Sequence, residues 1–217
     1  MITKRTSFIT IVTIAVAAIL FINISSTQAT DCAAVVTSAN NDHKQALKTH
    51  QSGTDDLLTA LYRIEDTLFA AMKSNCANHS SVFSTMGELQ LSLGQIPIAQ
   101  LYAVKALNMD NDNWQAHYVY GSALNLQKKY AEGLEHLISA SELQPDNYSL
   151  LVNLCSSYEK NQQYSKAIQA CSTAIDEGPY DIRGTAYFLR AQAHQANNEI
   201  TLAEKDLELA KEFGFKQ

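Results

Sequence analysis

Glycine and proline are scarce in this sequence, with 8 glycines and 3 prolines among 217 residues. These two residue types make up about 12% of an average protein, and the tight turns between many short strands depend on them. The shortage therefore argues against a β-sandwich or β-barrel and favours helices. Hydrophobic residues make up 46% of the chain and charged residues 18%, which is typical of a globular protein rather than a disordered chain or a coiled coil.

The sequence also lacks a surplus of basic residues. It contains 16 lysines and arginines against 22 aspartates and glutamates, for a net charge of -6. A protein that binds a nucleic-acid backbone neutralises phosphates with clustered positive charge. We therefore expect no nucleic-acid partner.

Catalytic and metal-binding motifs are absent as well. The sequence has no Gly-x-Ser-x-Gly, no glycine-rich phosphate loop and no dinucleotide fingerprint. The six histidines show no His-x-x-x-His spacing and do not form a haem-attachment or His-Glu-x-x-His motif. We therefore expect no catalytic residue, no metal and no cofactor, and we predict that His117 and His194 are packed core residues.

The first 29 residues resemble an export signal in their composition. Lys4 and Arg5 precede an apolar run from Phe8 to Ile24, and small residues follow up to Ala29. This order predicts a secretory signal peptide over residues 1–29 and a periplasmic protein. The alternative is an uncleaved anchor, although the run is at the short limit for crossing a bilayer. Membrane contact is expected only in that alternative.

A period of 34 residues organises the rest of the chain. Small residues, bulky residues and the last residue before each turn recur at this spacing through three units. After a two-residue insertion between Tyr180 and Ala186, the pattern resumes in a fourth unit. The recurring sets are Gly87, Gly121 and Cys155; Ile96, Tyr130 and Tyr164; Ala99, Gly133 and Ala167; Ala106, Ala140 and Ala174; and Asn111, Pro145 and Pro179.

The pattern within a unit has a physical meaning. Small side chains allow two antiparallel helices to approach closely, while the bulky apolar residues fill the space around them. Pro145 and Pro179 cannot continue a helix, so the chain turns there. Each unit is therefore predicted to be a helical hairpin.

The segments WQAHYVYGSALNLQKKYAEGLEH and LISASELQPDN resemble tetratricopeptide repeats. The resemblance extends from Ser80 to about Phe215 and implies an all-α, right-handed α-solenoid of stacked antiparallel helical hairpins. Its units are expected at about 80–113, 114–147, 148–181 and 184–217. The sequence departs from the family pattern at Asn111, Gly133, Cys155 and Glu177.

Residues 30–79 lack the repeat but still have helical periodicity. We predict one helix from Cys32 to about His50 and a second that starts near Thr54-Asp55-Asp56, with leucine and isoleucine on one face. Together they form an N-terminal hairpin. Because the terminal units of a solenoid are commonly atypical, this hairpin is expected to cap the array.

Four cysteines allow three pairings. If the N-terminal hairpin turns near residues 53–54, Cys32 and Cys76 lie level with each other across it. Cys155 and Cys171 are likewise equidistant from a turn near Gln163. Both pairs are predicted as disulfides in an exported chain; the alternative is buried free thiols.

The resemblance also implies where a partner binds. In the repeat family, places 2, 5, 9 and 12 of each first helix line the concave face. This assigns a partner-binding groove that is polar, has no lysine or arginine, and has Tyr118 and Phe188 as anchors. The candidate groove residues are Ser84, Glu88, Tyr118, Ser122, Asn125, Val152, Ser156, Glu159, Phe188, Gln192 and Gln195.

By this resemblance, the chain is expected to be an exported, non-catalytic scaffold for protein–protein interaction. Its groove would hold a peptide or helix of a cell-envelope partner. The alternative is an accessory factor that holds polypeptide substrates during envelope assembly, such as cytochrome c maturation. An enzyme is the least favoured reading because no motif in the sequence nominates an active site.

Overall fold

The computed structural model describes residues 31–51 and 57–215. The predicted signal peptide and the predicted helix start at Thr54–Asp56 lie outside these residues. Within them, no helix has both the length and the apolar character needed to cross a membrane.

The described residues form α-helices with one short 3-10 helix and no strand, which confirms the predicted all-α class. The helices follow one another as antiparallel hairpins. Their bounds are α2 (Cys32–Gln51), α3 (Leu57–Met72), η1 (Asn75–Asn78), α4 (Ser80–Ser92), α5 (Ile96–Met109), α6 (Trp114–Leu126), α7 (Tyr130–Leu143), α8 (Tyr148–Lys160), α9 (Tyr164–Glu177), α10 (Tyr180–Ala196) and α11 (Ile200–Glu212).

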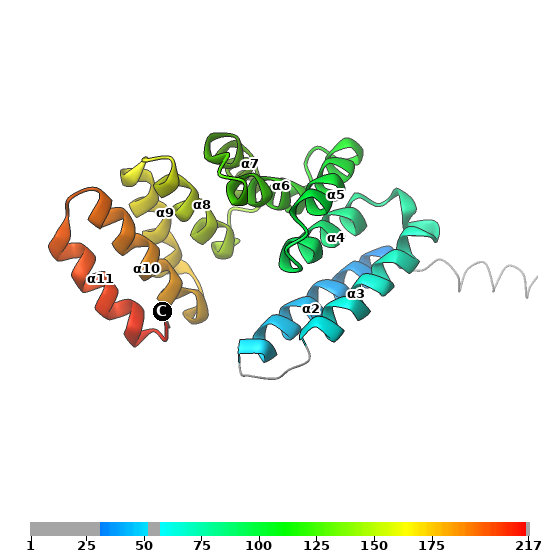
Figure 1. Cartoon of the computed structure of the whole chain (residues 1–217), viewed down its shortest axis with the longest axis horizontal. Helices are drawn as coiled ribbons and strands as arrows, with labels where there is room; N and C mark the ends of the chain where they lie inside the picture. Colours follow the sequence, from blue (N-terminus) through cyan, green and yellow to red (C-terminus); the bar gives the residue numbers. More distant parts are fainter. Residues whose placement is uncertain (1–30, 52–56, 216–217) are drawn as a thin grey trace, which may run out of the picture.

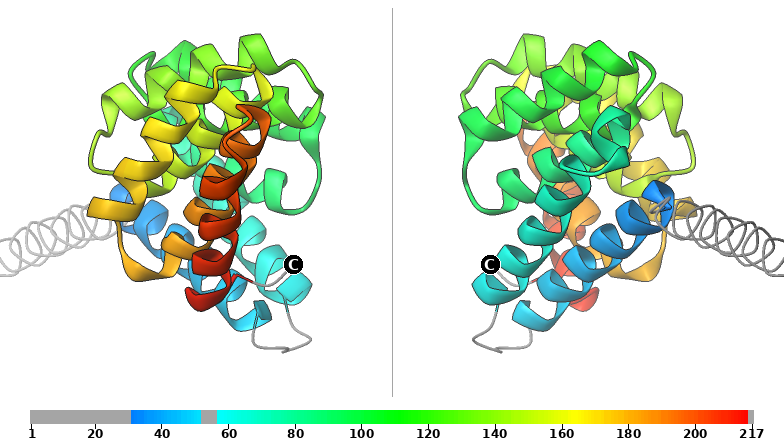
Figure 2. Two further views of the ribbon diagram at one scale, coloured as in Figure 1. Left: turned by 90° about the vertical axis from the view of Figure 1, so that its left-hand side faces the viewer. Right: turned by 90° about the vertical axis from the view of Figure 1, so that its right-hand side faces the viewer.

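The hairpins stack side by side into an arc, which is the predicted α-solenoid (Figure 1). The α2–α3 hairpin lies at one end of the arc and α10–α11 at the other, and Figure 2 views the arc from these two ends. The first helices of the repeat units, α4, α6, α8 and α10, lie toward the inside of the arc, and α2 lies on the same side. The inner face is therefore formed by elements from the whole described chain.

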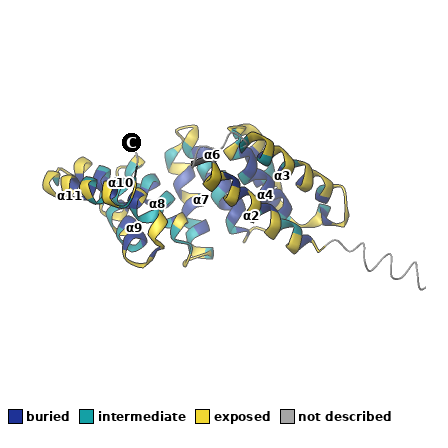
Figure 3. Cartoon of the chain, turned by 90° about the horizontal axis from the view of Figure 1, so that it is seen from below, coloured by how far each residue is buried: buried dark blue, intermediate teal, exposed yellow. Residues whose placement is uncertain are grey.

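Small residues at the helix crossings allow this close stacking. Buried residues occur along the whole length of the arc (Figure 3), and many of them are alanines. Gly121 on α6 and Gly133 on α7 face each other so closely that a methyl group on either would lie 2.8 Å from the backbone oxygen of the other. Gly133 stands where the family usually has alanine, and the side chain of Asn125 occupies the space that an alanine methyl would fill.

Two histidines are part of this packing. His117 and His194 are buried, as predicted. His117 Nε2 bonds the backbone oxygen of Asn111 at 2.9 Å, and its Nδ1 lies 3.0 Å from Nδ1 of His136. Burial is the largest cause of the lowered pKa of His136, followed by repulsion from His117.

Both predicted cysteine pairs are disulfides in the structure. Cys32 joins Cys76 with a Cα–Cα distance of 5.5 Å, and Cys155 joins Cys171 with a Cα–Cα distance of 5.4 Å. Each bridge closes a single hairpin. Two disulfides are typical of a chain that folds in an oxidising compartment outside the cytoplasm.

The turn inside each repeat unit contains one residue with left-handed backbone geometry. In the first unit this residue is Gly94, with a φ of 73°, and in the next three it is Lys128, Gln162 and Asn198, with φ between 60° and 64°. Gln162 and Asn198 are 36 residues apart rather than 34, because the insertion lengthens α10 to 17 residues. The chain therefore repeats the same turn whether or not a glycine is available for it.

This turn gives a stability prediction. A left-handed conformation costs a residue with a Cβ atom about 1 kcal/mol more than it costs glycine. Gln162→Gly is therefore expected to raise the free energy of unfolding by about 1 kcal/mol, and Gly94→Ala to lower it by about the same amount. Urea denaturation measures both, and Asn198→Gly serves as the control with a smaller gain, because asparagine tolerates this geometry. Equal stability of all three variants and the wild type would contradict the assignment.

Candidate functional site on the concave face

The inner side of the arc contains a cleft rich in amide side chains, which we call the amide cleft. It lies where α2, α4, α6 and the start of α8 meet, and it encloses about 170 Å³. Its lining residues are Asn40, Lys44, Glu88, Trp114, Gln115, Tyr118, Asn147, Ser149, Leu150 and Asn153.

A buried glutamine at the start of α6 organises this cleft. Gln115 Oε1 accepts hydrogen bonds from Ser84 at 2.9 Å and Thr85 at 3.2 Å. Its Nε2 group donates to Glu88 at 2.5 Å and to Asn40 at 3.3 Å. One amide thus holds α2, α4 and α6 together, and it fixes the position of the Glu88 carboxylate.

A second, larger cleft continues along the inner face, and we call it the apolar cleft. It encloses about 430 Å³ and shares Tyr118 and Asn153 with the amide cleft. Its lining residues are Leu91, Ser92, Tyr118, Ser122, Asn125, Leu126, Tyr130, Leu137, Asn153, Ser156 and Lys160. Leu126 is 63% exposed, and together with Leu91 and Leu137 it gives this cleft an apolar surface. Such a surface is typical of a binding site.

Tyr118 lies where the two clefts join. The pKa of its phenol is raised to about 12, mainly by burial and also by the nearby Glu88 carboxylate, while a hydrogen bond with Ser122 partly opposes the shift. The phenol is therefore neutral at any physiological pH. It can offer a partner an aromatic ring together with a hydroxyl group, the combination that is enriched at interfaces.

Five of the predicted groove residues come together in these two clefts. They are Glu88, Tyr118, Ser122, Asn125 and Ser156. The amide group of Asn125 is directed partly into the protein. Its nitrogen donates to buried Ser157 at 3.2 Å, and its buried oxygen has no hydrogen-bond partner among the described residues. These residues come from α4, α6 and α8, so the central units form the site.

Ser84 and Val152 are not part of either cleft. Ser84 is fully buried, and its hydroxyl is used by Gln115 and by the backbone oxygen of Ser81. Val152 packs against the cluster of Ala174, Ile175 and Ala186 between the third and fourth units. In this structure the side chains of these two residues are used for packing between helices.

Phe188, the second predicted anchor, is covered by the end of the chain. Its ring stacks on that of Phe215 with centroids 4.3 Å apart. Gly184 makes this approach possible, since a methyl group there would lie 2.8 Å from the backbone oxygen of Phe213. The side chain of Phe188 is therefore engaged within the protein.

The remaining predicted residues lie away from the clefts. Glu159 forms an ion pair with Lys160 at 2.9 Å. Gln192 is half-buried and Gln195 is exposed on α10, and neither lines the amide cleft or the apolar cleft.

The groove also contains residues that the sequence analysis missed. Lys44 lines the amide cleft and Lys160 the apolar cleft, although neither occupies one of the predicted lining places. Lys44 and Asn40 come from α2, where no repeat register points to them. His43 on the same helix bonds Ser92 of α4 at 2.9 Å, and burial is the main cause of its lowered pKa. The N-terminal hairpin therefore contributes side chains to the concave face.

Comparisons with known proteins agree with this architecture. The tetratricopeptide repeat family model matches residues 85–140 and 127–182. No curated protein matches the sequence.

Several solved structures share the fold. MamA from Desulfovibrio magneticus RS-1 is 18% identical with a TM-score of 0.60, and the match covers 81% of this chain and 94% of that one. PilF of Pseudomonas aeruginosa is 17% identical with a TM-score of 0.63, covering 85% of this chain and 80% of that one. YrrB, described as a tetratricopeptide repeat protein with an unusual peptide-binding site, is 15% identical with a TM-score of 0.59. The match covers 72% of this chain and 79% of YrrB. Together with the family model, these structures support the tetratricopeptide repeat family for the helical array of this chain.

Proposed function

We propose that this protein is an exported, non-catalytic scaffold that binds a peptide or a helix of a cell-envelope partner on its concave face. The observation that carries the proposal is the pair of joined clefts at Tyr118, which lie on the inner faces of α4, α6 and α8. Extended concave surfaces are the usual binding sites of repeat proteins. The fold likeness to YrrB adds an example of peptide binding by a tetratricopeptide repeat protein.

The chemistry of the clefts suits a polypeptide. The amide cleft offers Asn40, Asn147 and Asn153, whose side chains both donate and accept hydrogen bonds and therefore match the main chain of a peptide. The apolar cleft offers Leu91, Leu126 and Tyr118 to a bulky side chain. Among the described residues, no three His, Cys, Asp or Glu side chains are grouped to hold a metal ion.

Export is proposed from two features. The two disulfides are typical of an oxidising compartment, and residues 1–29 have the composition of a cleavable signal. Amino-terminal sequencing of the protein recovered from its native cells tests this, with Thr30 as the expected first residue.

Tyr118→Ala is the sharpest test of the groove. Truncation of an aromatic anchor at the centre of an interface costs about 2 kcal/mol or more, which corresponds to an affinity loss of about 30-fold. The measurement uses capture of the partner from the native envelope fraction, followed by titration of the purified partner. Tyr118→Phe is expected to lose far less, because the ring remains.

The matched control is Tyr62→Ala. Tyr62 is 55% exposed on α3 and lines none of the described clefts on the inner face. If Tyr118→Ala folds normally and binds the partner as well as Tyr62→Ala does, the partner does not bind in this groove.

A further inference from the structure

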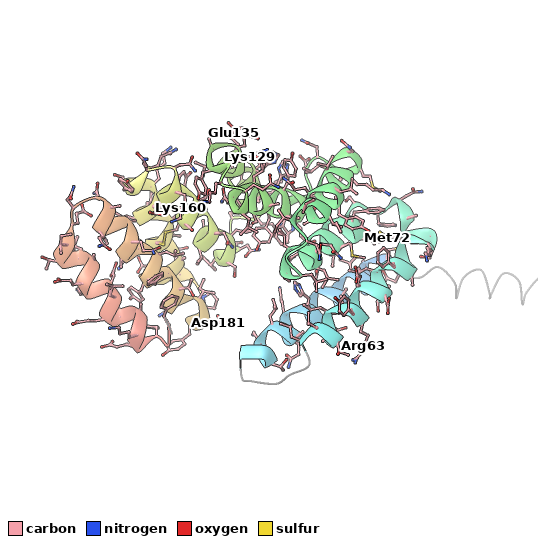
Figure 4. All side chains as sticks on the ribbon, in the orientation of Figure 1. Arg63, Met72, Lys129, Glu135, Lys160 and Asp181 are labelled. Carbon is pink, nitrogen blue, oxygen red and sulfur yellow. A yellow bond between two sulfur atoms is a disulfide. The ribbon has the colours of Figure 1, made fainter. Side chains whose placement is uncertain are left out.

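A third cleft adjoins the apolar cleft at the outer edge of the arc, and we call it the lysine cleft. It encloses about 460 Å³ between the α6–α7 turn and the α8–α9 turn. Figure 4 shows Lys129 and Lys160 on these two neighbouring turns. Its lining residues are Lys128, Lys129, Tyr130, Ala131, Glu132, Lys160, Asn161 and Gln162.

Hydrogen bonds hold the two turns in place. The amide nitrogen of Asn161 donates to the backbone oxygen of Tyr130 at 2.9 Å and to that of Ser157 at 2.8 Å. Lys128 and Gln162 occupy the left-handed positions of the two turns. The walls of the lysine cleft are therefore parts of the fold and not free surface loops.

The charge of this cleft is opposite to that of the whole protein. Three lysines line it, against the single carboxylate of Glu132, in a chain with a net charge of -6. Glu159 neutralises part of the charge of Lys160, but Lys128 and Lys129 have no ion pair with any described residue. The first turn of α7 also lines the cleft, and the positive end of that helix adds to the attraction for anions.

The lysine cleft and the apolar cleft form one surface, because Tyr130 and Lys160 line both. We propose that this surface selects a peptide segment in which a bulky apolar side chain is followed or preceded by a short acidic stretch. The apolar side chain enters beside Leu126, and the carboxylates lie over Lys128, Lys129 and Lys160. This inference rests on the proposed function, since it describes the partner of the same concave groove.

An acidic peptide fits better than other anions. A nucleic-acid backbone requires neutralisation of many phosphates along an extended basic surface, whereas this basic surface comprises three lysines in an acidic protein. A membrane surface would need the lysines alone, while the lysines here adjoin an apolar cleft that a bulky side chain can fill. Charge complementarity over a short distance is the arrangement that gives specificity to protein interfaces.

The test is selection of random 12-residue peptides displayed on phage against the purified protein. The wild-type pool is expected to be enriched in peptides that combine a large apolar residue with neighbouring Asp or Glu. The Lys128→Gln/Lys129→Gln variant should keep the apolar preference and lose the acidic one. The matched control is Lys205→Gln/Lys211→Gln, which removes two exposed lysines of α11 and should select the same peptides as the wild type.

One selected peptide is then measured by fluorescence anisotropy together with its Gln-for-Glu version. We expect the acidic peptide to bind at least tenfold more tightly at low salt, and this advantage to shrink at 300 mM salt and in the Lys128→Gln/Lys129→Gln variant, because salt screens exposed charges. Equal binding of the two peptides, or an acidic preference that survives in this variant, would overturn the inference.

The two proposals fail in different ways. If the selected peptides are apolar without an acidic preference, and the Leu126→Ser variant no longer binds them, the proposed groove is supported. The inference of an acidic partner would then be overturned. Failure to select any peptide that depends on Tyr118 or Leu126 would overturn both. A third outcome concerns lipids. If no acidic peptide is selected, and the protein binds phosphatidylglycerol vesicles but the Lys128→Gln/Lys129→Gln variant does not, the lysines bind a lipid surface. This result would overturn the inference.

Discussion

Replacement of Cys32 and Cys76 by alanine is expected to lower the free energy of unfolding of the N-terminal hairpin by about 4 kcal/mol. The bridge joins residues 44 positions apart, so its loss releases a long loop in the unfolded chain. For Cys155 and Cys171, 16 positions apart, the expected loss is about 3 kcal/mol. Hydrogen exchange of α2 and α3 measures the first effect, and exchange of α8 and α9 the second, because a repeat array opens unit by unit.

Chemical reduction of the wild-type protein provides the control for both variants. It removes the cross-links but keeps the buried sulfur atoms, so any additional loss in the alanine variants reports the packing of these atoms. Peptide mapping of the unreduced protein should find two bridged pairs. Recovery of four alkylated cysteines from folded protein, or unchanged exchange in both hairpins of the alanine variants, would show that the bridges do not stabilise the fold.

The second large effect is expected at the partly buried ion pair of the last unit. Arg190 binds the Asp206 carboxylate with two hydrogen bonds of 2.7 Å and 2.8 Å, and a third bond of 2.9 Å reaches Ser172. Asp206 is only 3% exposed, and its carboxylate raises the pKa of the Arg190 guanidinium. Asp206→Ala leaves this cation without its carboxylate partner, and because the Arg190 side chain is 19% exposed, the expected cost is about 2–3 kcal/mol, below that of a fully buried pair.

Thermal unfolding and hydrogen exchange of α10 and α11 measure this cost. The double variant Arg190→Met/Asp206→Leu is expected to lose much less stability than Asp206→Ala, because it removes both charges and keeps the side-chain volume. Lys205→Ala, on the exposed face of the same helix, serves as the neutral control. If the free energy of unfolding of Asp206→Ala is within about 1 kcal/mol of the wild-type value, the ion pair does not hold the last unit together.

The features that recur along the chain were predictable from the sequence. The 34-residue spacing predicted the hairpins, because a helix contact needs a small residue wherever two axes approach, and the same contact repeats in each unit. The disulfide pairs followed from the same geometry. Glu88, Tyr118 and Ser122 were predicted because a lining position occupies the same place in every first helix, and in the structure they line the two clefts.

The parts of the groove that depend on a single contact were not predictable. Asn40 and Lys44 lie in a hairpin outside the repeat, and they reach the groove because a shared core and hydrogen bonds to Gln115 and Ser92 hold α2 against the inner face. Phe188 has the correct place in its helix, but Phe215 covers it. Sequence periodicity does not show whether a side chain already contacts a residue that is distant in the sequence.

The cysteine pairs also bear on how the protein is made. The four cysteines pair in the order in which they occur, the first with the second and the third with the fourth. A chain that emerges amino-terminus first presents Cys32 and Cys76 to each other before Cys155 has appeared. Simple oxidation during emergence therefore leads to the native bridges, and the slow exchange of mispaired disulfides is not a required step in the maturation of this protein.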